Sequence, residues 1–134
     1  MSKVFEKLNL KDQRTISVLN GPDSFKADLA SLRGVTVINA LDGEAAPEFV
    51  LAFVTRQAEV DELSRAVARK TKGDAIVWFA YPKGTSRKYT CEFNRDTGWA
   101  VLKKLGFNTV RQVAIDEDWT ALRFRRVEFI KSRR

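Results

Sequence analysis

The sequence predicts a single α/β domain in which a mostly parallel sheet carries helices on both faces and ends in an antiparallel hairpin. Seven consecutive apolar or aromatic residues, from Ala75 to Tyr81, have the length and composition of a strand buried on both faces. Segments typical of strands and of helices alternate around it, which is the pattern of a three-layer domain. The 134 residues, 44% of them hydrophobic, are enough for one core but not for two domains, so residues 1–134 are expected to form one unit.

The individual elements follow from apolar spacing and from the positions of glycine and proline. A short lead-in helix or turn is expected near residues 4–10. The expected strands, rich in β-branched or apolar residues, are 15–20, 35–39, 48–55 and 74–81. The expected helices, each followed by a glycine, are 22–33, 56–72 and 99–105. Pro22 suits the first helical position, and Thr55 can cap the second helix.

Two final strands, 109–115 and 120–125, are separated by only four residues. Such a short link predicts an antiparallel hairpin. The alternation of apolar side chains slips at Arg125 and Arg126, which predicts a bulge or the end of the strand there.

Several classes of chemistry are excluded by composition. The chain has no histidine, so Ser-His-Asp and Cys-His nucleophilic sites and histidine-based zinc sites are impossible. The single cysteine, Cys91, permits no internal disulfide and is expected to be inert packing beside Phe93. The charged first seven residues are unlike a signal peptide, so a cytoplasmic location away from membranes is expected. No complete catalytic motif and no metal site is identified, and enzymatic activity is left open.

The net charge of +7 is concentrated at the end of the chain. Residues 123–134 contain six basic residues and one acid. A basic tail is therefore expected at about 126–134, and a solubilising role is favoured over nucleic-acid binding. The alternative is weak, sequence-independent binding of nucleic acid, for which the candidate residues are Arg123, Arg125, Arg126, Lys131, Arg133 and Arg134.

The order of elements resembles a shortened S-adenosylmethionine-dependent methyltransferase fold, a Rossmann-like topology, over roughly residues 14–129. A narrower resemblance is to an uncharacterised family of short bacterial proteins in which a strand ends in Pro-Lys and a serine follows, here Pro82-Lys83 and Ser86. That family also has a late Asp-Glu-x-Trp-Ser-x-Leu segment, here residues 116–122 with Thr120 in place of the serine. Its Asn-x-Pro after the first strand corresponds to Asn20-Gly21-Pro22.

The methyltransferase-like topology implies a position for the hairpin. Its second strand would lie antiparallel beside the 74–81 strand, so that Trp119 and Thr120 approach Tyr81 to Lys83. This resemblance therefore predicts that Lys83 and one acid of Asp116 or Asp118 face one concavity at the carboxyl end of the sheet, with Trp119 in its wall.

The loop after the first strand bears on the cofactor. Methyltransferases and dinucleotide enzymes use several glycines there, so that the backbone can approach the ligand. Asn20-Gly21-Pro22-Asp23-Ser24 has only one glycine. Methyl transfer by the standard mechanism is therefore not expected, and no cofactor is identified.

Asp42 stands near where such folds place a ribose-binding carboxylate, although a solvated loop acid is the more common case.

The other candidates each have a structural alternative. Lys83 and Ser86, with the neighbouring Arg87 and Lys88, could hold a phosphate or carboxylate or could be solvated loop residues. The acids 116–118 could bind a divalent cation, but turn formation is favoured. Trp119 could stack on a flat ligand or pack across a strand.

Taken together, these residues predict a Rossmann-like module that binds a small nucleotide-like or anionic ligand at the carboxyl end of its sheet. The candidate ligand-binding residues are Asn20, Gly21, Asp42, Lys83, Ser86, Asp116, Asp118 and Trp119. The alternatives are a nucleic-acid-associated protein and a structural or partner-binding domain with a vestigial pocket.

Overall fold

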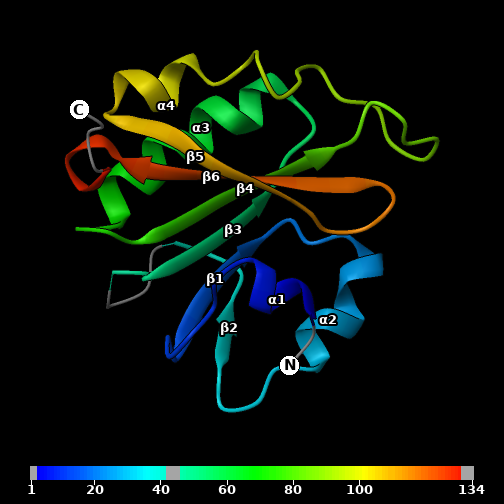
Figure 1. Cartoon of the computed structure of the whole chain (residues 1–134), viewed down its shortest axis with the longest axis vertical. Coiled ribbons are helices and arrows are strands. Elements are labelled where there is room, and N and C mark those ends of the chain that lie inside the picture. The colour runs from blue at the N-terminus through cyan, green and yellow to red at the C-terminus, as the bar shows by residue number, and fades with distance from the viewer. Residues whose placement is uncertain (1–2, 42–45, 131–134) are drawn as a thin grey trace.

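The computed structural model describes residues 3–41 and 46–130 and contains one six-stranded sheet in the order β2-β1-β3-β4-β6-β5 (Figure 1). The strands are β1 Thr15–Leu19, β2 Thr36–Ile38, β3 Phe49–Phe53, β4 Ile76–Pro82, β5 Phe107–Ala114 and β6 Trp119–Arg126. The helices are α1 Lys3–Lys7, α2 Lys26–Ala30, α3 Gln57–Lys70 and α4 Ala100–Lys104, with 3-10 turns η1 at Asp23–Phe25 and η2 at Val127–Phe129. The α/β class and the order of elements are as predicted.

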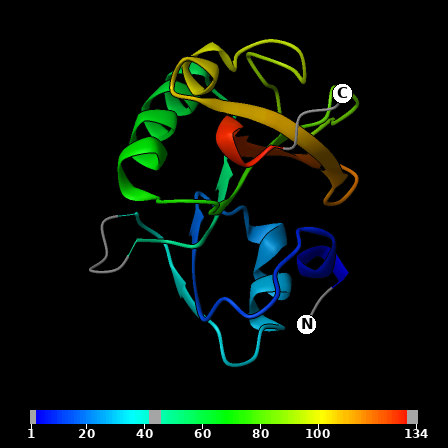
Figure 2. The same ribbon diagram turned by 60° about the vertical axis from the view of Figure 1, so that its left-hand side comes forward.

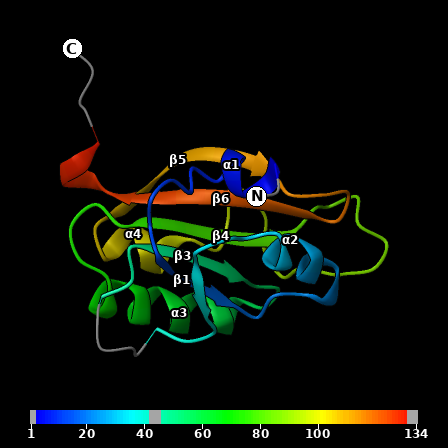
Figure 3. The ribbon, with the colours of Figure 1, turned by 90° about the horizontal axis from the view of Figure 1, so that it is seen from below.

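Each face of the sheet has its own apolar core. Phe5 of α1 packs with Ile16 and Trp78 on one face, whereas Phe79 packs with Leu102 of α4 on the other. The two turned views show α1 and α3 on opposite sides of the sheet (Figures 2 and 3). Every residue of β4 is buried, which confirms the prediction of an interior strand covered on both faces.

The sheet is parallel from β2 to β4 and antiparallel from β4 to β5. β1 pairs in parallel with both β2 and β3, and β3 pairs in parallel with β4. β6 then inserts antiparallel between β4 and β5, with Pro82 opposite Trp119 and Tyr81 opposite Thr120. The inserted hairpin that the resemblance implied is therefore confirmed.

The end of β6 also agrees with the sequence pattern. The strand stops at Arg126 and turns into η2, which accounts for the slip in apolar alternation. The ladder between β5 and β6 has a further irregularity between Thr109 and Arg111, on the edge strand.

The amino end of α3 differs from the expected cap. We expected the Thr55 side chain to cap this helix, but Arg56 occupies the N-cap position. The Glu59 carboxylate instead accepts hydrogen bonds from the backbone N–H groups of Thr55 and Arg56, at 2.9 and 3.0 Å, and from the Thr55 hydroxyl at 3.3 Å. The negative charge of Glu59 in the first turn also interacts favourably with the positive end of the helix dipole.

The connection from β2 to β3 contains no helix within its described residues, as its sequence predicted. Asp42 falls in the part of this connection that lies outside the described residues. No helix in the described ranges is long and apolar enough to cross a membrane.

Candidate functional site

The loops that follow the parallel strands meet the β5–β6 turn at one edge of the sheet. Asn20 and Gly21 follow β1, and Lys83 follows β4. Because β6 is antiparallel to β4, its first residue, Trp119, lies beside the end of β4. The Lys83 loop and the Trp119 hairpin are thus at the same end of the sheet, the end where α/β folds bind ligands.

Backbone and side-chain hydrogen bonds tie the Lys83 turn to the hairpin. The Lys83 backbone N–H donates to the Asp118 carbonyl at 2.8 Å, and the Ser86 hydroxyl donates to Asp118 Oδ1 at 2.8 Å. Asp116 Oδ1 accepts from the backbone N–H groups of Asp118 and Trp119, at 2.8 Å each. These carboxylates therefore stabilise the turn, which is the structural alternative considered for them.

Trp119 is also held by packing. Its side chain is only 3% exposed, and its ring lies 5.1 Å from the ring of Phe53 and 4.9 Å from that of Tyr89, measured between centroids. Its Nε1 is buried and has no hydrogen-bond partner among the described residues. The indole belongs to the core beneath the hairpin, so packing explains its position.

Asn20 occupies the point where the strand order reverses. The chain leaves β1 toward β2 on one side, whereas β3 and β4 lie on the other. Asn20 has a left-handed backbone with φ 58°, a conformation that asparagine tolerates better than most residues. Its side-chain Nδ2 donates to the Phe53 carbonyl at 3.4 Å, so the amide bridges the ends of β1 and β3.

Two cavities meet at Asn20 and Asn39, which line both of them. The first, of about 710 Å³, lies on the α2 side and includes Gly21, Lys26 and Leu29. The second, of about 460 Å³, runs along α3 past Leu63 and Arg69. We call these cavities together the Asn20–Asn39 groove. Lys83, Ser86 and Asp118 lie outside it.

Asn39 and Lys26 were not among the sequence-predicted site residues. Asn39 directly follows β2, so the same carboxyl-end argument that selected Asn20 could have found it. Lys26 could not be found in this way, because its place in the groove depends on how α2 packs beside β1. Both residues are exposed. Lys26 also forms an exposed ion pair with Asp23, in which Lys26 Nζ lies 3.3 Å from Asp23 Oδ1.

Cys91 has the environment of an unreactive thiol. It is half-buried, and burial raises the pKa of its thiol above the usual range. The backbone hydrogen bond from Phe93 lowers this pKa, but by less than burial raises it. At neutral pH the thiol therefore stays protonated, which argues against a nucleophilic role.

The basic C-terminal segment is partly engaged within the domain. Arg125 forms a two-pronged ion pair with Asp74, at 2.7 and 2.6 Å, and this hydrogen bonding lowers the pKa of Asp74. The Arg126 guanidinium donates to three carbonyls at the end of α3, and it lies 4.8 Å from the ring centroid of Phe107. Residues 131–134 lie outside the described ranges.

Replacing Arg126 should therefore cost stability. The three carbonyls belong to Ala68, Thr71 and Gly73, at 3.0 to 3.3 Å from the guanidinium. We expect Arg126→Ala to lower the free energy of unfolding in urea by about 1–3 kcal/mol, because these helix-end carbonyls lose a charged donor. Arg125→Ala is the matched control, with an expected loss below about 1 kcal/mol because its ion pair is one-third exposed. Equal losses for the two variants would contradict the capping role.

Solved structures share this architecture across almost the whole chain. An S-adenosylmethionine-dependent methyltransferase from Aquifex aeolicus is similar over 93% of this chain and 88% of its own, with a TM-score of 0.65 and 14% identity. The chain has a methyltransferase-like fold. Mitomycin 7-O-methyltransferase is similar with a TM-score of 0.64 and 12% identity, although the alignment covers 93% of this chain and only 53% of that one.

A third similar structure contains a bound ligand. Magnesium protoporphyrin IX methyltransferase from Synechocystis PCC 6803, solved with bound SAH, has a TM-score of 0.59 and 10% identity over 92% of this chain and 81% of its own. No family model and no curated protein sequence matches the chain. At these identities the likeness concerns the methyltransferase-like fold.

The β1 loop does not fit the glycine-rich loop that approaches a bound cofactor closely. A Cβ added to Gly21 would meet only Val18 Cγ1, at 3.7 Å, which is an ordinary contact. The left-handed residue of the loop is Asn20, and Pro22 offers no N–H to a ligand. The exposed Asp23 carboxylate, which opens η1, adds negative charge beside the loop.

Proposed function

We propose that this protein is a binding module for a small nucleotide-like ligand, seated in the Asn20–Asn39 groove, and that it does not transfer methyl groups by the standard mechanism. The observation that carries the proposal is the meeting of two cavities at Asn20 and Asn39, at the carboxyl ends of β1 and β2. Ligands of open α/β sheets bind outside these strand ends, at the point where the strand order reverses.

The chemistry of the groove suits a nucleoside with a charged substituent. Val18, Leu29 and Val37 supply apolar surface for a flat base on the α2 side. The two asparagine amides offer both donors and acceptors for sugar hydroxyls or base edges. Arg69 and Lys70 on the α3 side provide positive charge for a phosphate, whereas Lys26 on the α2 side is paired with Asp23.

The local geometry of the β1 loop supports binding without methyl transfer. A single glycine, followed by Pro22 and the Asp23 carboxylate, gives little backbone donor surface for a cofactor that carries its own carboxylate. The fold is therefore methyltransferase-like, whereas the activity expected of the groove is ligand binding.

Calorimetric titration with adenosine, adenosine monophosphate and S-adenosylmethionine tests the proposal. We expect a nucleoside or nucleotide probe to bind, and Asn20→Gly to weaken that binding by at least about tenfold. Glycine accepts the left-handed backbone of residue 20, so the variant removes the amide while keeping the loop. The melting temperature of the free protein should fall only slightly, because the variant also loses the long hydrogen bond to the Phe53 carbonyl. Lys103→Met replaces an exposed lysine of α4 that lies outside the groove, so this control should bind the ligand as the native protein does.

Three outcomes would count against the proposal. Unchanged ligand affinity in Asn20→Gly would show that the ligand does not bind in the groove. Loss of binding in Lys83→Ala alone would move the site to the Lys83 turn. Micromolar affinity for S-adenosylmethionine would overturn the exclusion of standard methyl-transfer chemistry.

A further inference from the structure

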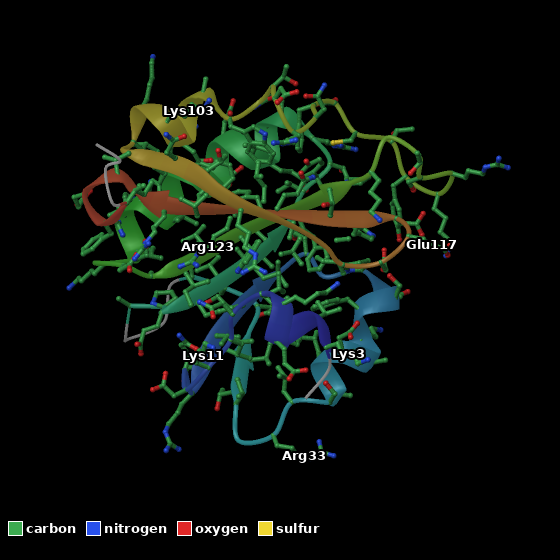
Figure 4. All side chains as sticks on the ribbon, viewed as in Figure 1. Lys3, Lys11, Arg33, Lys103, Glu117 and Arg123 are labelled. Atoms are coloured by element: carbon green, nitrogen blue, oxygen red, sulfur yellow. The ribbon has the colours of Figure 1, made fainter. Side chains whose placement is uncertain are left out.

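A separate cavity of about 520 Å³ lies at the opposite end of the parallel strands. Glu48 precedes β3 and Asp74 precedes β4, so the cavity opens at the amino ends of these strands. Arg123 and Arg125 of β6 line one wall, and Lys72 also borders the cavity. Figure 4 shows Arg123 over the sheet, far from Lys103 of α4.

The Arg123 guanidinium has no hydrogen-bond or ion-pair partner among the described residues. Its side chain is half-buried, and its Nε is buried without a hydrogen-bond acceptor. Neither of its terminal nitrogens forms a hydrogen bond or ion pair within the described ranges. A buried guanidinium nitrogen without an acceptor is costly, because desolvation is not repaid.

Two arginines and one acid surround the Arg123 guanidinium. Arg111 lies directly opposite it on β5, and Arg125 is two residues along on the same face of β6. Like charges directly across a ladder destabilise a sheet. Asp74 is already engaged by both prongs of Arg125. Burial lowers the pKa of the Arg123 guanidinium, and the charges of Arg125 and Arg111 lower it further, whereas the charge of Asp74 raises it.

We infer that the Arg123 cavity is a binding site for a small organic molecule with a single carboxylate, separate from the Asn20–Asn39 groove. The planar guanidinium fork matches a carboxylate in two-pronged geometry. Three basic and two acidic side chains line the cavity, so its net charge is +1, which suits a monoanion better than a phosphate dianion. These side chains are Lys72, Arg123, Arg125, Glu48 and Asp74. The side-chain amides of Asn9 and Gln13 supply further polar groups at the rim.

Titration of the full chain with potassium acetate, at constant ionic strength set with potassium chloride, tests this inference. We expect a saturable change in the Nε–Hε resonance of Arg123 and a rise in melting temperature that chloride does not reproduce. Arg123→Met should abolish the response to acetate. Because the variant also loses the repulsion with Arg111 and Arg125, its melting temperature without acetate should equal or exceed that of the native protein. Arg123→Lys keeps the charge but not the fork and should lose most of the affinity for acetate.

Matched controls separate this site from the groove and from general salt effects. Lys103→Met removes an exposed cation elsewhere and should respond to acetate normally, as should Asn20→Gly. The inference is overturned by the absence of a saturable shift in the native protein, or by an unchanged acetate response in Arg123→Met. Tighter binding of inorganic phosphate than of acetate would overturn the carboxylate assignment.

Discussion

Trp119→Ala is expected to lower the free energy of unfolding by about 3–5 kcal/mol. The indole is 3% exposed and packs edge-on against Phe53, and its removal leaves a cavity between the hairpin and the α1 face of the sheet. Denaturation in guanidinium chloride, followed by the fluorescence of Trp78 and Trp99, measures the loss directly.

Lys83→Ala is the control for this prediction. Lys83 sits in the turn that contacts the same hairpin, but its hydrogen bond to Asp118 comes from the backbone, which the substitution keeps. Lys83→Ala should therefore lower the free energy of unfolding by no more than about 0.5 kcal/mol. If Trp119→Ala costs no more than Lys83→Ala, the indole is not part of the core.

Gly98→Ala is expected to destabilise the protein by roughly 2–4 kcal/mol. Gly98 has φ +96°, and an added Cβ would lie 2.6 Å from the Cβ of Phe93 and 2.9 Å from the Gln57 side-chain oxygen. The Gln57 amide donates to the Gly98 carbonyl at 2.8 Å, so the amino end of α3 would be disturbed as well. Thermal and urea unfolding both measure this effect.

Gly34→Ala separates backbone strain from steric overlap. Gly34 has a similar positive φ of 69°, but no atom lies within 4 Å of its added Cβ. Its expected cost is therefore only the left-handed penalty, about 1–2 kcal/mol. A Gly98→Ala loss equal to that of Gly34→Ala would show that Phe93 and Gln57 move aside freely.

Most of the fold could be predicted because each element carries a local signal. The apolar run before Pro82 marks β4, and the glycines at 34, 73 and 106 follow the helices they were expected to close. The insertion of β6 beside β4 came from the resemblance in topology, since no local signal pairs Trp119 with Pro82.

The site was less predictable because it depends on packing between distant segments. Asn20 and Gly21 were identified from their place after β1, but the groove exists only because Asn39 and α3 border the same strand ends. The unpaired Arg123 could not be foreseen either. Arg123 lacks an ion pair because Asp74, the nearby acid, pairs with Arg125.

Mapping of amide chemical shifts during titration with adenosine monophosphate tests the central proposal most directly. Binding in the Asn20–Asn39 groove predicts saturable changes at the Gly21 backbone amide and at the side-chain amides of Asn20 and Asn39. The amides of Lys83 and Ser86, outside the groove, should change least. Changes confined to the Lys83 turn or to Arg123, or no saturable change at millimolar ligand, would contradict it.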